Sequence, residues 1–300
     1  MTFSKILDDI RSLKIQGAKA VALAGLDALS LVVRGGGSDP EALKSKLCDA
    51  KQELFMARPT EPCLRNAVSY VLAQEDTDHP LEFRDGVKHR IEEARSYLKE
   101  ADARIAEAGS HKIRKNMVLY THCHSSTVVR ILLRAKEGGA SFRVNNTETR
   151  PLYQGRITAK ELSSHDIPVN HYVDAAAREA IRKADLMLIG CDAITTEGNI
   201  INKIGSHLFA LWAHHFDVPI YACTHLWKFD AQTVFGYDEP MEDRCAAEVW
   251  DKCPRNVTIK NPAFEAVPSH LVSGIICERG IFRPEMVVEE MKKEEWMFSP

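Results

Sequence analysis

The chain has 300 residues and a mass of 33.6 kDa, which suits one large domain or two small ones. Hydrophobic residues make up 45% and charged residues 27%, close to the globular average, so a disordered or fibrous chain is excluded. The net charge of -3 argues against a nucleic-acid-coating protein, and no apolar run approaches the ~18–20 residues that span a bilayer. We therefore expect neither a nucleic-acid partner nor a membrane.

The eight cysteines contain no CxxC pair, and in a chain of this length they do not resemble a disulfide scaffold. Residues 1–14 are amphipathic and carry acids, without the apolar core of a signal peptide. Both observations favour a cytoplasmic protein with reduced thiols. Most of these thiols are expected to be small core residues.

The first 110 residues or so have helical periodicity. Apolar residues recur on one face at 3–10, residues 17–33 are apolar nearly all round, and residues 83–105 follow a three- and four-residue stripe. A further helix is predicted over 41–54, because Asp39 and Pro40 form a typical helix start.

After residue 114 short apolar runs alternate with helical segments. Strands are predicted at 116–120, 141–145, 169–173, 186–190 and 219–223, and helices at 125–136, 158–164, 175–184 and 205–215. This alternation predicts an α/β fold: an N-terminal helical domain over 1–113, then a doubly wound, Rossmann-like parallel sheet domain over 114–300. Ligands of such sheets bind at the carboxyl ends of the strands.

The first strand end carries a cysteine between two histidines, in the segment Thr121 to Ser126. A helix start follows Cys123 at once, and this setting is expected to lower the thiol pKa and favour a thiolate base or nucleophile. The alternative is a buried structural cysteine. A metal site on His122, Cys123 and His124 is disfavoured, because adjacent residues of an extended segment point to opposite faces.

A second set of polar residues follows the strand at 186–190. Asp192 has no basic neighbour in the sequence, so it is a candidate proton donor with a raised pKa, although a turn cap is the alternative. Asn202 and Lys203 precede a helix start after Gly205, an arrangement that suits an anion. Arg150, in the loop after the strand at 141–145, is a partner either for a phosphate or for an internal carboxylate.

Taken together, these motifs resemble the archaeal ribose-1,5-bisphosphate isomerases, whose superfamily includes methylthioribose-1-phosphate isomerases and regulatory subunits of translation initiation factor 2B. The resemblance covers essentially the whole chain. Its motifs are IQGA (15–18), ARPT (57–60), THCHSS (121–126), TETRPLYQGRITAKELSSHDIPV (147–169), GCDAIT (190–195), GNIINKIGS (198–206), WKF (227–229), NPAFEAVP (261–268) and ICERGIFRP (276–284).

The resemblance implies an aldose–ketose isomerase that converts ribose 1,5-bisphosphate into ribulose 1,5-bisphosphate through a cis-phosphoenolate, in a pathway of AMP salvage. It makes Cys123 the base and Asp192 the acid, and it implies no metal and no cofactor. The substrate contacts that it implies are Gln16, Gly17, Ala18, Lys19, Arg58, Asn202, Lys203 and Lys228. It also implies a homo-oligomer, either a dimer or a hexamer.

Gln16 departs from the family pattern, which has arginine there. An arginine grips a phosphate with two charged hydrogen bonds and a glutamine cannot. Two alternatives therefore stay open: an isomerase of 5-methylthioribose or 5-deoxyribose 1-phosphate, and a non-catalytic regulatory subunit of the initiation-factor type. The presence of both Cys123 and Asp192 favours an enzyme over a regulator.

Overall fold

The computed structural model describes residues 1–37, 39–73, 79–236 and 243–298. By their contacts the residues form two compact units. Unit 1 comprises Met1–Glu100, Trp227–Asp238 and Glu289–Pro300, and unit 2 comprises Ala101–Leu226 and Glu239–Val288. The sequence-based boundary after residue 113 differs from this division, and the two domains proposed from the sequence stay a prediction. Within the described ranges, no helix has the length and hydropathy needed to cross a bilayer.

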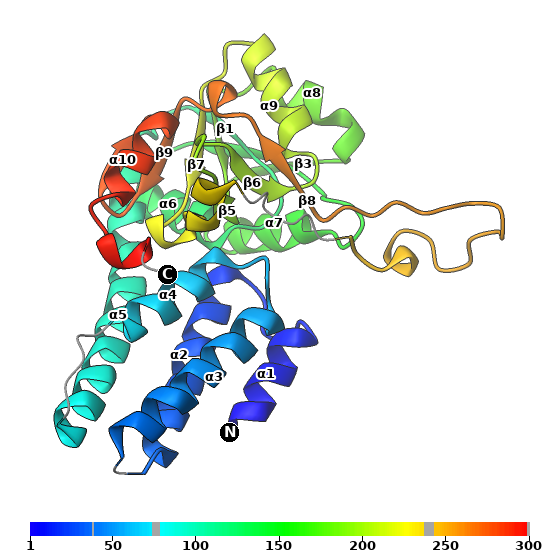
Figure 1. Cartoon of the computed structure of the whole chain (residues 1–300). Helices are drawn as coiled ribbons and strands as arrows, with labels where there is room; N and C mark the ends of the chain where they lie inside the picture. The colour runs from blue at the N-terminus through cyan, green and yellow to red at the C-terminus, as the bar shows by residue number, and fades with distance from the viewer. Residues whose placement is uncertain (38, 74–78, 237–242, 299–300) are drawn as a thin grey trace. The chain divides into compact units, whose positions relative to one another are not determined.

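Unit 1 is built from helices. They are α1 (Phe3–Arg11), α2 (Ala18–Gly35), α3 (Pro40–Ala57), α4 (Pro62–Leu72) and the first part of α5 (Pro80–Ser110), and Figure 1 shows α1 to α4 side by side. Helix α2 lies against α1, α3 and α4, which explains why it is apolar nearly all round. Asp39 caps α3 by accepting a hydrogen bond from the Glu41 N–H at 3.1 Å.

Unit 2 is centred on a seven-stranded sheet in the order β10-β9-β7-β4-β1-β2-β3, parallel except for β10. Its strands are β1 (Val118–Thr121), β2 (Arg143–Thr147), β3 (Val169–Tyr172), β4 (Leu186–Ile189), β7 (Ile220–Cys223), β9 (Gly274–Cys277) and β10 (Gly280–Phe282). All four residues of β4 are buried, as expected of a central strand covered on both faces.

Helices cover both faces of this sheet. They are α6 (Ser126–Glu137), α7 (Gln154–Ser164), α8 (Ala177–Ile181) and α9 (Ser206–His215). Helix α6 contacts α7 and α8 contacts α9, and in Figure 1 the second pair lies above the strands and the first below them. This arrangement confirms the predicted α/β fold with a helical N-terminal region and a doubly wound, mostly parallel sheet.

A second, antiparallel sheet of three strands was not predicted. It consists of β5 (Ala193–Ile194), β6 (Ile200–Lys203) and β8 (Phe264–Val267), in the order β5-β6-β8. A short helix, α10 (Val287–Met291), follows β10 in the chain. The small sheet matters for function, because β5 and β6 carry the polar residues that follow β4.

Candidate functional site

The loop after β1 holds Cys123 in an unusual backbone conformation. The φ angle of Cys123 is +65°, in the left-handed region that a non-glycine residue seldom adopts. Two threonines hold this conformation: the Cys123 N–H donates to Thr149 Oγ1 at 3.0 Å, and Thr158 Oγ1 donates to the Cys123 carbonyl at 2.9 Å. Such strain persists only where its surroundings enforce it and is common at functional sites.

The two histidines that flank Cys123 have separate partners. The buried His122 ring lies between Thr147 Oγ1, 2.9 Å from Nδ1, and the Ile204 carbonyl, 2.9 Å from Nε2. His124 Nδ1 lies 3.1 Å from Thr158 Oγ1. Burial lowers the pKa of His122 to about 4 and also lowers the pKa of His124. Within the described ranges, no group of three or more His, Cys, Asp or Glu side chains is arranged to hold a metal ion.

The pKa of the Cys123 thiol is shifted in the opposite direction to the one that its position at a helix start predicts. Burial raises its pKa to about 11, against a lowering influence from the Lys203 ammonium and a smaller one from the His124 backbone N–H. Asp192 and Asp174 raise the pKa further. The expectation of a lowered pKa is therefore wrong for this structure, because the desolvation of a buried thiolate outweighs the helix start.

The polar residues after β4 pack against this loop. A side chain at Gly190 would place its Cβ 3.0 Å from Ser125 Cβ and 3.5 Å from Asn202 Oδ1, so glycine permits the close approach of the three segments. Asp192 is tied to β6, since its N–H donates to the Ile201 carbonyl at 2.8 Å. The end of β4, the loop after β1 and strand β6 thus converge on one place.

The turn between β6 and α9 has its own hydrogen bonds. Asn202 Nδ2 donates to Ser206 Oγ at 2.9 Å, and Ser206 Oγ donates to the Lys203 carbonyl at 2.6 Å. The Lys203 ammonium lies 4.4 Å from the ring centroid of Phe264. Gly205 is the N-cap residue of α9 and has a φ of +101°. These bonds orient the helix N-terminus beside a lysine, which suits an anion.

Unit 2 therefore brings together four of the residues singled out from the sequence: Cys123, Asp192, Asn202 and Lys203. Lys203 and Asp192 both act electrostatically on the Cys123 thiol. Cys191, beside Asp192, is buried and its Sγ donates to the Ala193 carbonyl, as expected of a packing residue. All eight cysteines are free thiols.

The other predicted substrate residues belong to unit 1. Gln16 precedes α2 and its Nε2 donates to the Leu13 carbonyl at 2.7 Å. Gly17 has a φ of +88° and caps α2. The remaining residues are Ala18 and Lys19 in the first turn of α2, Arg58 at the end of α3, where its Nε lies 3.6 Å from Glu61 Oε1, and Lys228 in a short 3-10 helix.

Sequence reasoning missed the residues that support Cys123. Thr147, Thr149 and Thr158 contact the segment His122 to His124, and Asp174 accepts from the N–H groups of Thr149 and Arg150. The threonines lie inside the 147–169 motif, so that motif was the available signal. The Arg150 guanidinium donates to Tyr153 Oη at 2.8 Å and to the Val249 carbonyl at 3.2 Å, so the carboxylate partner considered for it is absent among the described contacts.

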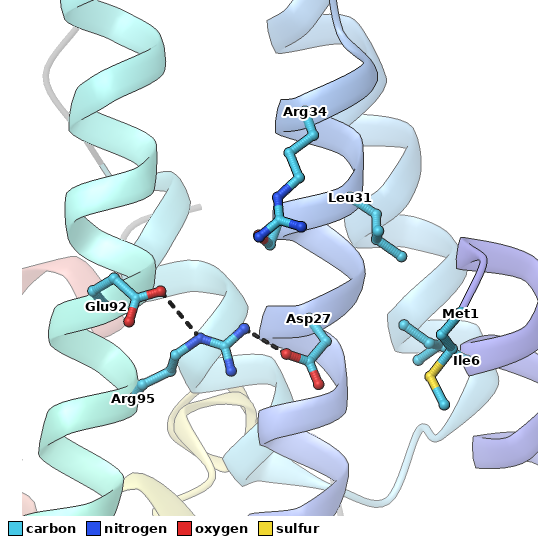
Figure 2. A pocket seen from close by; sticks show the side chains of 8 residues that line it. Met1, Ile6, Asp27, Leu31, Arg34, Glu92 and Arg95 are labelled. Atoms are coloured by element: carbon cyan, nitrogen blue, oxygen red, sulfur yellow. Dashed lines mark hydrogen bonds and ion pairs between the residues drawn. The ribbon is translucent and has the colours of Figure 1, made fainter.

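A separate pocket of about 420 Å³ lies within unit 1, lined by α2, α5 and the start of the chain. Figure 2 shows Arg95 between Glu92 and Asp27. Its Nε lies 3.5 Å from Glu92 Oε1 and its Nη2 lies 2.5 Å from Asp27 Oδ1. Two carboxylates thus pair with Arg95. None of the predicted site residues lines this pocket.

Known proteins resemble this chain in sequence and fold over nearly their whole lengths. A ribose 1,5-bisphosphate isomerase of Haloterrigena turkmenica is 35% identical, over 95% of this chain and 91% of the relative. A methylthioribose-1-phosphate isomerase of Symbiobacterium thermophilum is 31% identical, over 95% and 86%. The crystal structure of a Pyrococcus horikoshii OT3 translation initiation factor eIF-2B matches with a TM-score of 0.81 at 29% identity, over 95% of this chain and 98% of that one. The model of the initiation factor 2 subunit family matches residues 14–284, and the chain belongs to that family.

Proposed function

We propose that the protein is an aldose–ketose isomerase that converts ribose 1,5-bisphosphate into ribulose 1,5-bisphosphate. The observation that carries the proposal is the convergence of Cys123, Asp192 and Lys203 at one edge of the sheet in unit 2. The 35% identity to a relative that bears this name supports it. A cation beside a proton-transfer pair suits a phosphorylated sugar.

In the proposed mechanism the anomeric phosphate prevents simple ring opening, so the ring oxygen has to be protonated. Asp192 donates this proton as the bond between C1 and the ring oxygen breaks. The Cys123 thiolate takes the proton from C2, which forms the cis-phosphoenolate. Reprotonation at C1 and loss of the proton on the C2 hydroxyl then give the ketose. General acid and general base steps of this kind contribute about 10²–10⁴-fold each.

The remaining assignments concern binding. Lys203 and the N-terminus of α9 hold phosphate in the proposal, together with Asn202 and with Gln16, Gly17, Ala18, Lys19, Arg58 and Lys228 of unit 1. No metal or redox cofactor takes part in the steps above. We also propose a cytoplasmic homo-oligomer. The segment 244–261 extends beyond β8 (Figure 1) and leaves Trp250 and Val257 exposed by 50% and 43%, which supports a partner chain on this surface.

One observation keeps a second substrate under consideration. The Gln16 amide donates to the Leu13 carbonyl in the turn after α1, and it carries no charge for a phosphate. An isomerase of a 5-deoxy or 5-methylthio sugar 1-phosphate needs only one phosphate site. The same Cys123 and Asp192 chemistry serves both substrates.

The experiment that tests the proposal is incubation with α-ribose 1,5-bisphosphate, with ribulose 1,5-bisphosphate detected by coupling to RuBisCO. We expect product from the wild type, none from Cys123→Ser, and a loss of about 10²-fold or more from Asp192→Asn. Cys48→Ser removes an exposed thiol of unit 1 and is the matched control with wild-type turnover. Full activity of Cys123→Ser contradicts the assigned base, and no product from the wild type contradicts the substrate.

A further inference from the structure

We propose that His122 is a positioning residue: its ring bridges the ends of β1 and β6 and thereby holds the Lys203 ammonium beside the Cys123 thiol. The geometric part of this inference is independent of the reaction. Its catalytic consequence rests on the proposed function, in which Cys123 is the base.

The hydrogen bonds of the ring define its tautomer. The Ile204 carbonyl can only accept, so the His122 Nε2 carries the proton and donates at 2.9 Å. The ring is neutral, because burial lowers its pKa to about 4, and Nδ1 therefore accepts from Thr147 Oγ1 at 2.9 Å. Tyr120 Oη lies 3.2 Å from the same threonine oxygen and donates a hydrogen bond to it, because the threonine hydroxyl proton is already donated to His122. Both nitrogens are thus committed to fixed partners.

The His122 ring also packs closely against neighbouring residues. Phe209 of α9 meets it edge to face with ring centroids 4.7 Å apart, and a Cβ at Gly205 would lie 3.1 Å from His122 Nε2. The side chain is 2% exposed. A ring held on one edge by Phe209 and Gly205, and at both nitrogens by hydrogen bonds, has little freedom to move. It therefore fixes the distance between the two backbone segments that it joins.

Those two segments carry the reacting thiol and its cation. Cys123 follows His122 directly, and Lys203 precedes Ile204 directly. The charged side chains that act on the thiol are Lys203, which favours the thiolate, and Asp192 and Asp174, which oppose it. Loss of the bond to Ile204 frees the Lys203 segment from the β1 loop, while Asp174 stays bonded to the N–H groups of Thr149 and Arg150. The balance then shifts against the thiolate.

Two substitutions separate this role from simple packing. Glutamine places its amide N–H₂ about where Nε2 lies and keeps the donor to Ile204. Asparagine is shorter, so its amide reaches Thr147 but not Ile204. If the bridge to β6 is what matters, His122→Gln behaves like the wild type and His122→Asn does not. If packing alone matters, the two variants are similarly impaired, because both replace the ring.

The readout is the rate at which iodoacetamide alkylates Cys123 in the full-length protein between about pH 7 and pH 10.5, measured by mass spectrometry of the Cys123 peptide. Exposed Cys48 is the reference within each sample. We expect His122→Asn to lower the Cys123 rate at pH 8, taken relative to that of Cys48, by about three- to tenfold compared with the wild type, and His122→Gln to keep the wild-type rate. Lys203→Met is expected to give the same decrease as His122→Asn, and the double variant no larger one.

An unchanged rate in His122→Asn overturns the inference, and so does an additive decrease in the double variant. Circular dichroism first establishes that each variant is folded, and Lys203→Met still tests the coupling if His122→Asn is not. In the isomerase assay His122→Asn is expected to lower kcat about as much as it lowers the alkylation rate, with a smaller effect on KM. A wild type without isomerase activity, but with the expected alkylation pattern, would refute only the proposed function.

Discussion

At the scale of single residues, burial sets the chemistry of the site more than local sequence does. Cys123 and His122 are neighbours, and desolvation acts on both: it raises the pKa of the thiol to about 11 and lowers that of the imidazole to about 4. Both side chains are therefore uncharged at neutral pH. In the proposed mechanism Cys123 has to become a thiolate, and Lys203 is the charged side chain that favours this form.

The neutral state of His122 has a consequence for stability against acid. An unfolded histidine binds its proton with a pKa near 6.5, whereas folded His122 does so near 4. The unfolded chain therefore binds more protons below pH 6.5, and the folded state loses stability as the pH falls from 6.5 through 4, by up to about 3 kcal/mol. Above pH 6.5 His122 is neutral in both the folded and the unfolded state, so its titration causes no loss of stability there.

Urea unfolding at pH 7.0, 5.5 and 4.5 measures this loss. His124 also has a lowered pKa and contributes in the same direction, so the wild type has to be compared with His122→Gln. We expect the free energy of unfolding to fall less steeply with acid in the variant, because glutamine has no proton to bind. Parallel pH profiles for the two proteins would show that His122 does not titrate in this way.

At the scale of elements, the turn between β6 and α9 is where backbone geometry and site geometry meet. Gly205 has a φ of +101°, and an added Cβ would lie 3.1 Å from His122 Nε2 and 3.1 Å from the Phe209 ring. Gly139, after α6, has a φ of +86° but nothing within 4 Å of an added Cβ. Both positions require glycine for conformational reasons, and only one borders the proposed bridge.

Alanine substitutions of these two glycines give a matched test of the turn between β6 and α9. Gly139→Ala is expected to cost about 1–2 kcal/mol of stability from left-handed strain alone, with wild-type turnover per folded molecule. Gly205→Ala has the same strain and also displaces the His122 ring, so we expect a larger loss of stability and a fall of at least about tenfold in kcat. Thermal or urea unfolding and the isomerase assay measure both. Equal effects of the two substitutions would argue against a role for the turn.

The elements that the sequence predicts well are those whose pattern is local. The apolar runs of β1, β4 and β7 and the periodic helices between them were identified within a few residues. Strand β5 has two residues and β6 pairs antiparallel with β8, more than 60 residues away, so neither leaves a local pattern. The thiol pKa was mispredicted for a related reason: burial raises it, and burial is set by tertiary packing rather than by the local sequence.

At the scale of the whole molecule, the residues assigned to substrate binding are divided between the two compact units. Cys123 and Asp192, the proposed proton-transfer residues, belong to unit 2, and most of the residues assigned to the substrate from the family resemblance belong to unit 1. If the proposed assignments hold, a substitution in unit 1 is expected to change which sugar phosphate is bound without changing Cys123 or Asp192.

Gln16 is the residue where this separation can be tested. It donates to the Leu13 carbonyl and brings no charge, whereas an arginine there adds two charged donors for a phosphate. If residue 16 contacts the 5-phosphate, Gln16→Arg should raise kcat/KM for ribose 1,5-bisphosphate by about tenfold and leave 5-deoxyribose 1-phosphate unchanged, because a charged hydrogen bond contributes about 1.5–3 kcal/mol. Gln52→Arg adds the same charge at an exposed position of α3 and is the matched control, for which we expect no change with either sugar. An equal gain with both substrates would place residue 16 at the phosphate they share. No gain with either would mean that residue 16 contacts no phosphate, and the 5-deoxy and 5-methylthio sugars would then become the better substrates to test.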